Sequence, residues 1–125
     1  MYDMKNMSKR KILEINAPEA MRAFVAFDKL ALAAGAIPEK YKELMAIAVA
    51  LTTQCPYCIE IHSKKAREVG ASEPEIAETV LVAAALRAGG AITHGTHAVN
   101  GSPTDFAIGV EMPDRHTMGT AAVRP

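Results

Sequence analysis

Two cysteines, one histidine and one glutamate have the spacing of a thiol site. Cys55 and Cys58 are the only cysteines of this 125-residue chain, His62 follows Cys58 by four residues, and Glu43 precedes Cys55 by twelve. If the segment after Cys55 is helical, each residue turns about 100° around the axis, and Cys55, Cys58 and His62 lie within about 60° of one another. Cys58 and His62 are then a direct one-turn pair, which suits a nucleophile and its base.

Two influences compete over which sulfur is the nucleophile. The reactive species is the thiolate, so the question is what removes the proton. The positive end of a helix beginning at Pro56 favours ionisation of Cys55. A histidine base favours the sulfur that it can reach, and His62 is one turn from Cys58. We favour Cys58, because the helical spacing places the base beside it.

The elements that must position these residues are predicted to be helices. Prolines at first-turn positions, glycines at helix ends and apolar residues at helical spacing predict an all-α, single-domain bundle of about five to six helices. Asn16 is the predicted cap of the first helix, Ser72 and Glu75 form a predicted capping box, and the pair Gly89-Gly90 is predicted to end the fourth helix. The predicted helices begin near Pro18, Pro38, Pro56, Ser72 and Ala91, and the last ends near Val99.

Glu43 stands at the start of the apolar run Leu44–Leu51. A carboxylate there is expected to be partly removed from water, and so to exchange protons with a neighbour. On the residues alone, a solvated glutamate in a first helical turn is the commoner case.

The pattern Glu-x11-Cys-x2-Cys-x3-His resembles the thiol branch of the alkylhydroperoxidase D and carboxymuconolactone decarboxylase family. The four residues named above match it at every position, and the likeness in helix order extends over about Pro18 to Val99. The resemblance implies Cys58 as the peroxidatic nucleophile, Cys55 as the resolving cysteine, His62 as the base and Glu43 as the proton relay. It also implies an alkyl hydroperoxide reductase-like enzyme with peroxiredoxin-type activity.

The implied cycle begins with attack of Cys58 on a hydroperoxide, followed by condensation of the sulfenic acid with Cys55. A dithiol reductant, either a lipoyl group on a protein or a thioredoxin-like protein, then reduces the Cys55–Cys58 disulfide. No cofactor and no metal are implied, and the expected assembly is a homo-oligomer, a trimer or a hexamer. The sequence departs from the better-known peroxidases at Tyr57, where they have a histidine. Tyr57 is therefore a candidate substrate contact through its hydroxyl.

Composition and net charge argue against a nucleic-acid-binding protein and against a membrane protein. Half of the residues are hydrophobic, and the formal net charge is zero. This charge gives no electrostatic footprint for nucleic acid or an anionic membrane. The uninterrupted apolar runs are far shorter than the ~20 residues of a membrane span. We expect a cytoplasmic protein with a polar lead at 1–16, a helical core at 17–100 and an irregular tail at 101–125, in which Phe106 to Val110 suggest a short extended arm.

Three alternatives remain open. Zinc binding would join Cys55, Cys58 and His62 to a fourth ligand such as His94, but no second cysteine pair exists, and His94 and His97 are more simply read as a polar helix end. Decarboxylation of a muconolactone-type acid does not require the cysteine pair, and its candidate basic residues, Arg67 and Arg87, suit exposed helix positions equally well. The third alternative is a non-enzymatic, redox-responsive oligomeric module.

Overall fold

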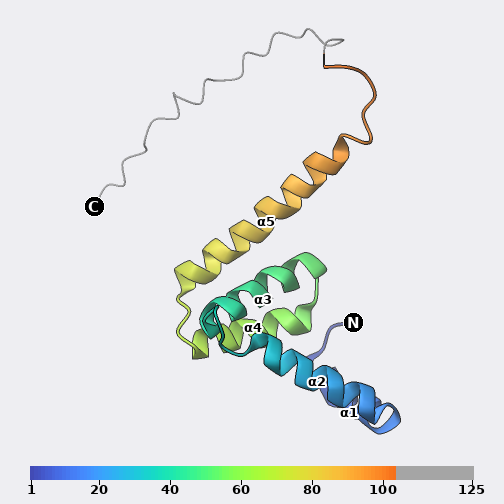
Figure 1. The fold of residues 1–125 in the computed structure, drawn as a ribbon, viewed down its shortest axis with the longest axis vertical. Helices are drawn as coiled ribbons and strands as arrows, with labels where there is room; N and C mark the ends of the chain where they lie inside the picture. The colour runs from blue at the N-terminus through green and yellow to red at the C-terminus, as the bar shows by residue number, and fades with distance from the viewer. Residues whose placement is uncertain (104–125) are drawn as a thin grey trace, which may run out of the picture. The chain divides into compact units, whose positions relative to one another are not determined.

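The computed structural model describes residues 1–103. A short 3-10 helix and five α-helices make up this part of the chain, which contains no strand (Figure 1). The predicted all-α class is therefore confirmed. The chain divides into two units, Met1–Thr93 and His94–Pro125, which are described separately. The elements are η1 (Met4–Lys9), α1 (Arg10–Asn16), α2 (Pro18–Leu32), α3 (Glu39–Thr53), α4 (Pro56–Glu68) and α5 (Glu73–Gly95).

The centre of the first unit is the pair α3 and α4, which pack along one another in opposite directions (Figure 1). Leu44 and Ile47 of α3 meet Ala66 of α4, and Ala71 and Ile76 complete this small core. Ala66 has no exposed surface, so a larger side chain there would force α3 and α4 apart. The two helices that carry the thiol motif are thus also the best-packed pair of the unit.

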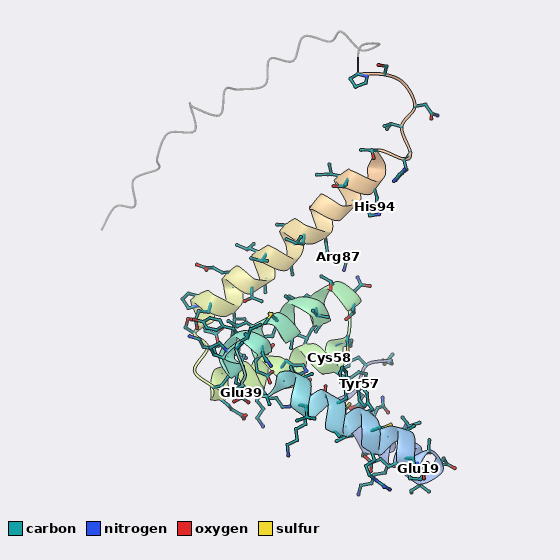
Figure 2. The ribbon with its side chains drawn as sticks, in the orientation of Figure 1. Glu19, Glu39, Tyr57, Cys58, Arg87 and His94 are labelled. Atoms are coloured by element: carbon teal, nitrogen blue, oxygen red, sulfur yellow. A yellow bond between two sulfur atoms is a disulfide. The ribbon has the colours of Figure 1, made fainter. Side chains whose placement is uncertain are left out.

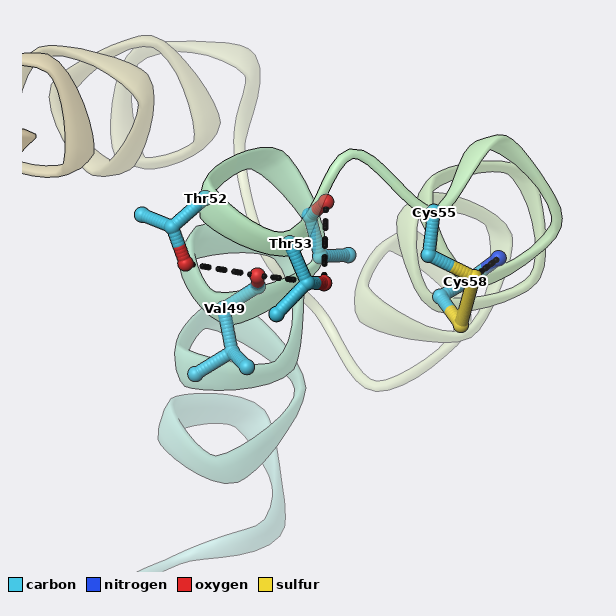
Figure 3. The surroundings of a disulfide bond; sticks show 6 residues. Val49, Thr52, Thr53, Cys55 and Cys58 are labelled. Carbon is cyan, nitrogen blue, oxygen red and sulfur yellow. Dashed lines mark hydrogen bonds between the residues drawn. A yellow bond between two sulfur atoms is a disulfide. The ribbon is translucent and has the colours of Figure 1, made fainter.

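A tight reversal joins α3 to α4. Gln54 has a φ of 55°, in the left-handed region, and is the C-cap of α3. The hydroxyl groups of Thr52 and Thr53 both donate to the carbonyl oxygen of Val49, at 2.8 and 3.0 Å (Figure 3). The backbone N–H of Cys55 donates to the carbonyl oxygen of Ala50 at 3.0 Å. The last turn of α3 is therefore closed off directly before the first cysteine.

The predicted start of α4 at Pro56 is that observed, and the predicted Ser72 cap precedes α5 directly. Gly70, with a φ of 92°, follows the end of α4, and the left-handed region suits glycine there. Ser72 and Glu75 form the predicted capping box: the N–H of Glu75 donates to Ser72 Oγ at 3.2 Å, and the N–H of Ser72 donates to Glu75 Oε2 at 2.8 Å. Local side-chain chemistry thus fixes where this helix begins.

The prediction that Gly89-Gly90 ends the fourth helix is wrong. α5 continues through both glycines to Gly95, so the separate helix predicted from Ala91 does not exist. A glycine inside a helix costs only about 1 kcal/mol relative to alanine, and the good helix formers on both sides offset this cost.

Two polar contacts tie α5 to α3. Lys40 Nζ lies 2.9 Å from Glu75 Oε1 near the start of α5. Farther along, Arg87 Nη1 donates to the carbonyl oxygens of Leu51 and Thr52, at 3.4 and 3.1 Å. These carbonyls belong to the last turn of α3, where the helix leaves its acceptors without intrahelical donors. Arg87 therefore caps α3 from a neighbouring helix.

The N-terminal residues are more regular than the polar lead expected from the sequence. Residues 4–16 form η1 and α1, and Asp3 caps η1 by accepting from the N–H of Lys5 at 2.9 Å. Asn16 does not cap α2: its Nδ2 donates to the carbonyl of Ile12 at 2.7 Å, and Ala17 holds the N-cap position. The weak apolar period of this segment failed to predict it because α1 packs mainly on α2 rather than in the core. The extended arm predicted at 106–110 lies outside the described residues.

Large apolar side chains are exposed on α2 and α5. Phe27 and Leu30 on α2 and Leu81 and Leu86 on α5 are each about two-thirds exposed or more. Within residues 1–103, α5 alone is long and apolar enough to cross a membrane, a property of length and composition that core helices of soluble proteins share. Only 6% of its apolar window is buried in the single chain. Exposed apolar patches on proteins are often sites of contact with other proteins.

Candidate active site

The structure joins Cys55 and Cys58 in a disulfide at the start of α4 (Figure 3). Cys55 is the N-cap of α4 and Pro56 is its first residue, so Cys58 lies in the first helical turn. The Cα atoms of the two cysteines are 5.3 Å apart, and the N–H of Cys58 donates to Cys55 Sγ at 3.3 Å. Pro56 provides no N–H, which leaves the amide of Cys58 as the donor that faces the first sulfur. Both cysteines are half-buried, within reach of small molecules.

The neighbouring helix α3 carries a buried carboxylate. Glu43 on α3 is 2% exposed, and it is the one buried charged residue of the described part of the chain. His62 Nδ1 lies 2.6 Å from Glu43 Oε2, and the His62 side chain is 15% exposed. A carboxylate buried this deeply requires a hydrogen-bonding or charged partner, and His62 is that partner. The contact joins α3 to α4 across 19 residues of sequence.

The arrangement brings together the residues that the motif selected, in two pairs. The disulfide joins Cys55 to Cys58, and the hydrogen bond joins Glu43 to His62. His62 follows Cys58 by one turn of the same helix, so the two pairs share a face of α4. A hydrogen bond from Nδ1 to a carboxylate fixes the orientation of the imidazole and leaves Nε2 for proton exchange. Imidazole–carboxylate pairs of this kind can act as bases.

Glu43 also lines a polar pocket between α2, α3 and α4. The pocket contains Asp28 and Lys29 from α2 and Lys65 and Glu68 from α4. Mixed charges of this kind hold water, and a carboxylate facing them can exchange a proton with solvent. Glu43 is therefore buried beside a pocket that is lined by charged side chains of both signs.

Tyr57, between the cysteines, is half-buried and is contacted by the N-terminal residues. Asn6 Nδ2 donates to the Tyr57 hydroxyl oxygen at 3.3 Å, and the rings of Tyr2 and Tyr57 pack edge to face with centroids 4.9 Å apart. Tyr2 also donates its hydroxyl proton to Glu60, and this hydrogen bond raises the pKa of Tyr2 to about 12. The sequence did not predict that Tyr2 and Asn6 contact Tyr57, because they precede it by about fifty residues and no local pattern indicates such a contact.

The other candidates named from the sequence occupy different places. The rings of His94 and His97, in the second unit, have centroids 6.2 Å apart. Within residues 1–103 no three His, Cys, Asp or Glu side chains are arranged to hold a metal ion. Arg67 bonds Glu73, with Nε 2.6 Å from Oε1, and Arg87 caps α3. Arg67 thus forms an ion pair on the surface, and Arg87 stabilises the end of a helix.

Comparison with known proteins places this geometry in a family. The family model described as "Carboxymuconolactone decarboxylase family" matches residues 18–100. The chain is 48% identical over 77 residues to "Uncharacterized protein 4 in cox locus" of Paracoccus denitrificans, covering 62% of this chain and 69% of that protein. It is 34% identical over 65 residues to a Cupriavidus necator protein, covering 52% and 58%.

Two solved structures share the fold. A carboxymuconolactone decarboxylase family protein from Legionella pneumophila, solved in its apo form, has a TM-score of 0.62 and 32% identity, covering 66% of this chain and 75% of that chain. A protein from Methanobacterium thermoautotrophicum has a TM-score of 0.64 and 30% identity, covering 68% and 96%. This chain belongs to the carboxymuconolactone decarboxylase family.

Proposed function

We propose that the protein is a thiol peroxidase that reduces hydroperoxides through Cys55 and Cys58. The observation that carries this proposal is the hydrogen bond between the buried Glu43 of α3 and His62 of α4, the helix that begins with a disulfide between the cysteines. An imidazole that is bonded to a buried carboxylate and lies one turn from a thiol can serve as the base for that thiol. A disulfide whose partners are three residues apart is the product expected of a resolving step.

In the proposed cycle, His62 accepts the proton of Cys58 and Glu43 stabilises the resulting imidazolium. The Cys58 thiolate attacks the terminal oxygen of the hydroperoxide, the O–O bond breaks, and Cys58 becomes a sulfenic acid while an alcohol leaves. Cys55 attacks this sulfenic acid, water leaves, and the disulfide forms. A lipoyl or thioredoxin-like dithiol then reduces the disulfide by thiol exchange and is itself oxidised.

The surroundings support an oligomeric, cytoplasmic enzyme as part of the same proposal. The apolar faces of α2 and α5 offer the surface that a homo-oligomer would bury. A thiol pair that cycles between two states suits a reducing compartment. Decarboxylation is the second activity that the family name suggests. It is the weaker candidate, because Arg67 and Arg87 are engaged with Glu73 and with the end of α3 rather than with the cysteine face.

The deciding experiment measures peroxide consumption by chelator-treated protein with a dithiol reductant, with mass spectrometry of the thiols in parallel. Turnover that leaves a Cys55–Cys58 disulfide as the oxidised product supports the peroxidase. If both thiols remain free after exposure to cumene hydroperoxide, the proposal is wrong, and decarboxylation or a non-enzymatic redox module replaces it. A disulfide that forms without turnover favours the redox module.

A further inference from the structure

The N-terminal arm, residues Met1–Lys9, reaches the one residue that separates Pro56 from the second cysteine. Tyr57 lies beside Cys58 at the start of α4 (Figure 2), and the N-terminus of the chain lies near this end of α4 (Figure 1). Asn6 contacts the Tyr57 hydroxyl, and the Tyr2 ring packs on the Tyr57 ring. Two separate residues of the arm thus fix both the ring and the hydroxyl of one side chain.

The direction of the hydrogen bond from Asn6 determines what Tyr57 can do. The amide nitrogen of Asn6 can only donate a hydrogen bond, so the Tyr57 oxygen is the acceptor in their 3.3 Å contact. The hydroxyl proton of Tyr57 is therefore left for another acceptor. Glu60, one helical turn after Tyr57, is the nearest carboxylate in sequence, and the Tyr2 hydroxyl donates to it. The arm thereby engages the group that would compete for the Tyr57 proton.

We propose that Asn6 and Tyr2 are positioning residues that orient the Tyr57 hydroxyl as a proton donor to the leaving oxygen of the hydroperoxide. This inference rests on the peroxidase function proposed above and assigns a task to the arm, which lies outside the residues matched by the family model. A donor poised where negative charge develops stabilises the transition state without further reorganisation.

The step balances as follows. The Cys58 thiolate forms a bond to the terminal oxygen of the peroxide, and the O–O bond breaks with its electron pair on the other oxygen. The sulfur is oxidised by two electrons and the peroxide is reduced by two. The alkoxide that leaves takes the proton of the Tyr57 hydroxyl and becomes an alcohol. The tyrosinate then regains a proton from solvent, and the His62 imidazolium releases the proton of Cys58 to solvent, so that protons balance over the step.

The test compares two reactions at Cys58 in the reduced, full-length protein. Oxidation by cumene hydroperoxide requires protonation of the leaving alkoxide, whereas alkylation by iodoacetamide releases iodide, which needs no proton. Asn6→Asp replaces the donor by an acceptor of nearly the same shape, so it draws the Tyr57 proton toward itself. Tyr57→Phe removes the proton altogether. Matched controls are Asn16→Asp, which makes the same exchange at an N-terminal site, and Tyr41→Phe, which removes a hydroxyl on α3.

Asn6→Asp and Tyr57→Phe are expected to slow oxidation about 10-fold or more, up to the ~100-fold or larger effects typical of general acids, with unchanged alkylation. The double variant should be no slower than Tyr57→Phe, because both changes act through one proton. Oxidation of Asn6→Asp at the wild-type rate, or an equal loss in both reactions, overturns the inference while the peroxidase stands. Oxidation of wild-type Cys58 no faster than that of a free thiol overturns the peroxidase, and this inference with it.

Discussion

His62 Nδ1 lies 2.6 Å from Oε2 of Glu43, and this contact joins α4 to a buried carboxylate of α3. It provides a partner for a buried carboxylate, and it restrains the imidazole of His62, which follows Cys58 by one helical turn. Removing either partner should therefore affect both stability and thiol reactivity.

His62→Ala should destabilise the protein by about 3 kcal/mol, because it leaves the Glu43 carboxylate buried without its partner. Glu43→Gln should cost less, since an amide oxygen still accepts from His62. Urea unfolding measures both. Glu68→Gln, at an exposed 3.9 Å contact with Lys64, is the control and should shift stability by less than about 0.5 kcal/mol. A loss from His62→Ala as small as that of the control would contradict the role given to this pair.

The two cysteines should separate in function. Cys58→Ser should abolish peroxide consumption, because the nucleophile is lost. Cys55→Ser should leave a sulfenic acid on Cys58 that dimedone traps and mass spectrometry detects, since the resolving thiol is gone. Full activity in Cys58→Ser, or a dimedone adduct on Cys55 in that variant, would reverse the assignment.

The contact between the N-terminal arm (Met1–Lys9) and α4 should weaken at high pH. The hydrogen bond to Glu60 raises the pKa of Tyr2 from the ordinary 10.0 to about 12, so the folded protein holds this proton more tightly than the unfolded chain. The contribution of Tyr2 is therefore complete below about pH 10 and is lost as the pH rises through about 12. Titration of phenolate absorbance should show one tyrosine with a midpoint near 12, and Tyr2→Phe should remove that transition. If Tyr41→Phe removes the transition instead, the transition belongs to Tyr41 and the assignment to Tyr2 is wrong.

Arg87→Met should weaken the connection between α5 and α3. The substitution keeps the apolar stem and removes the donors to the Leu51 and Thr52 carbonyls, which water then solvates. We expect a loss of about 1 kcal/mol, and faster amide exchange in the last turn of α3. Lys64→Met is the control for loss of a surface charge. Unchanged exchange in residues 50–54 would show that Arg87 does not hold this end.

Gly89→Ala and Gly90→Ala should each stabilise the chain by roughly 0.5–1 kcal/mol. Both glycines are inside α5 without a positive φ, and an added Cβ would meet nothing within 4 Å at either position. Thermal unfolding combined with light scattering measures stability and assembly together. A gain in stability with unchanged mass supports the single-chain geometry. A fall in mass would show that a second copy approaches the glycines closely.

The sequence predicted well wherever structure is decided locally. The start of α5 follows from Ser72 and Glu75, whose side chains bond the backbone within three residues, and the start of α4 follows from Pro56. Glu43 was correctly associated with a desolvated position, but only its spacing to the cysteines favoured that reading over a solvated glutamate. The Gly89-Gly90 pair misled because a propensity of about 1 kcal/mol is small beside the continuity of a long helix.

The parts that could not be predicted depend on contacts between distant residues. Tyr57 looked like an isolated aromatic between two cysteines, and nothing near it in the chain indicates that Asn6 and Tyr2 contact it. Arg87 gave no sign that its acceptors are the last carbonyls of α3. Such contacts become visible only when the helices are placed in space, because their sequence separations exceed any helical period.

The short span of the disulfide determines how much the disulfide contributes to the stability of the fold. Cys55 and Cys58 are three residues apart, so the bond closes a very small ring in the unfolded chain. In the chain-entropy account such a ring restrains the unfolded ensemble by only about 2 kcal/mol, against nearly 5 for a ring of a hundred residues. The core of Leu44, Ile47 and Ala66 lies outside that ring. In the proposed cycle, we therefore expect reduction of this disulfide to leave the α3–α4 core folded.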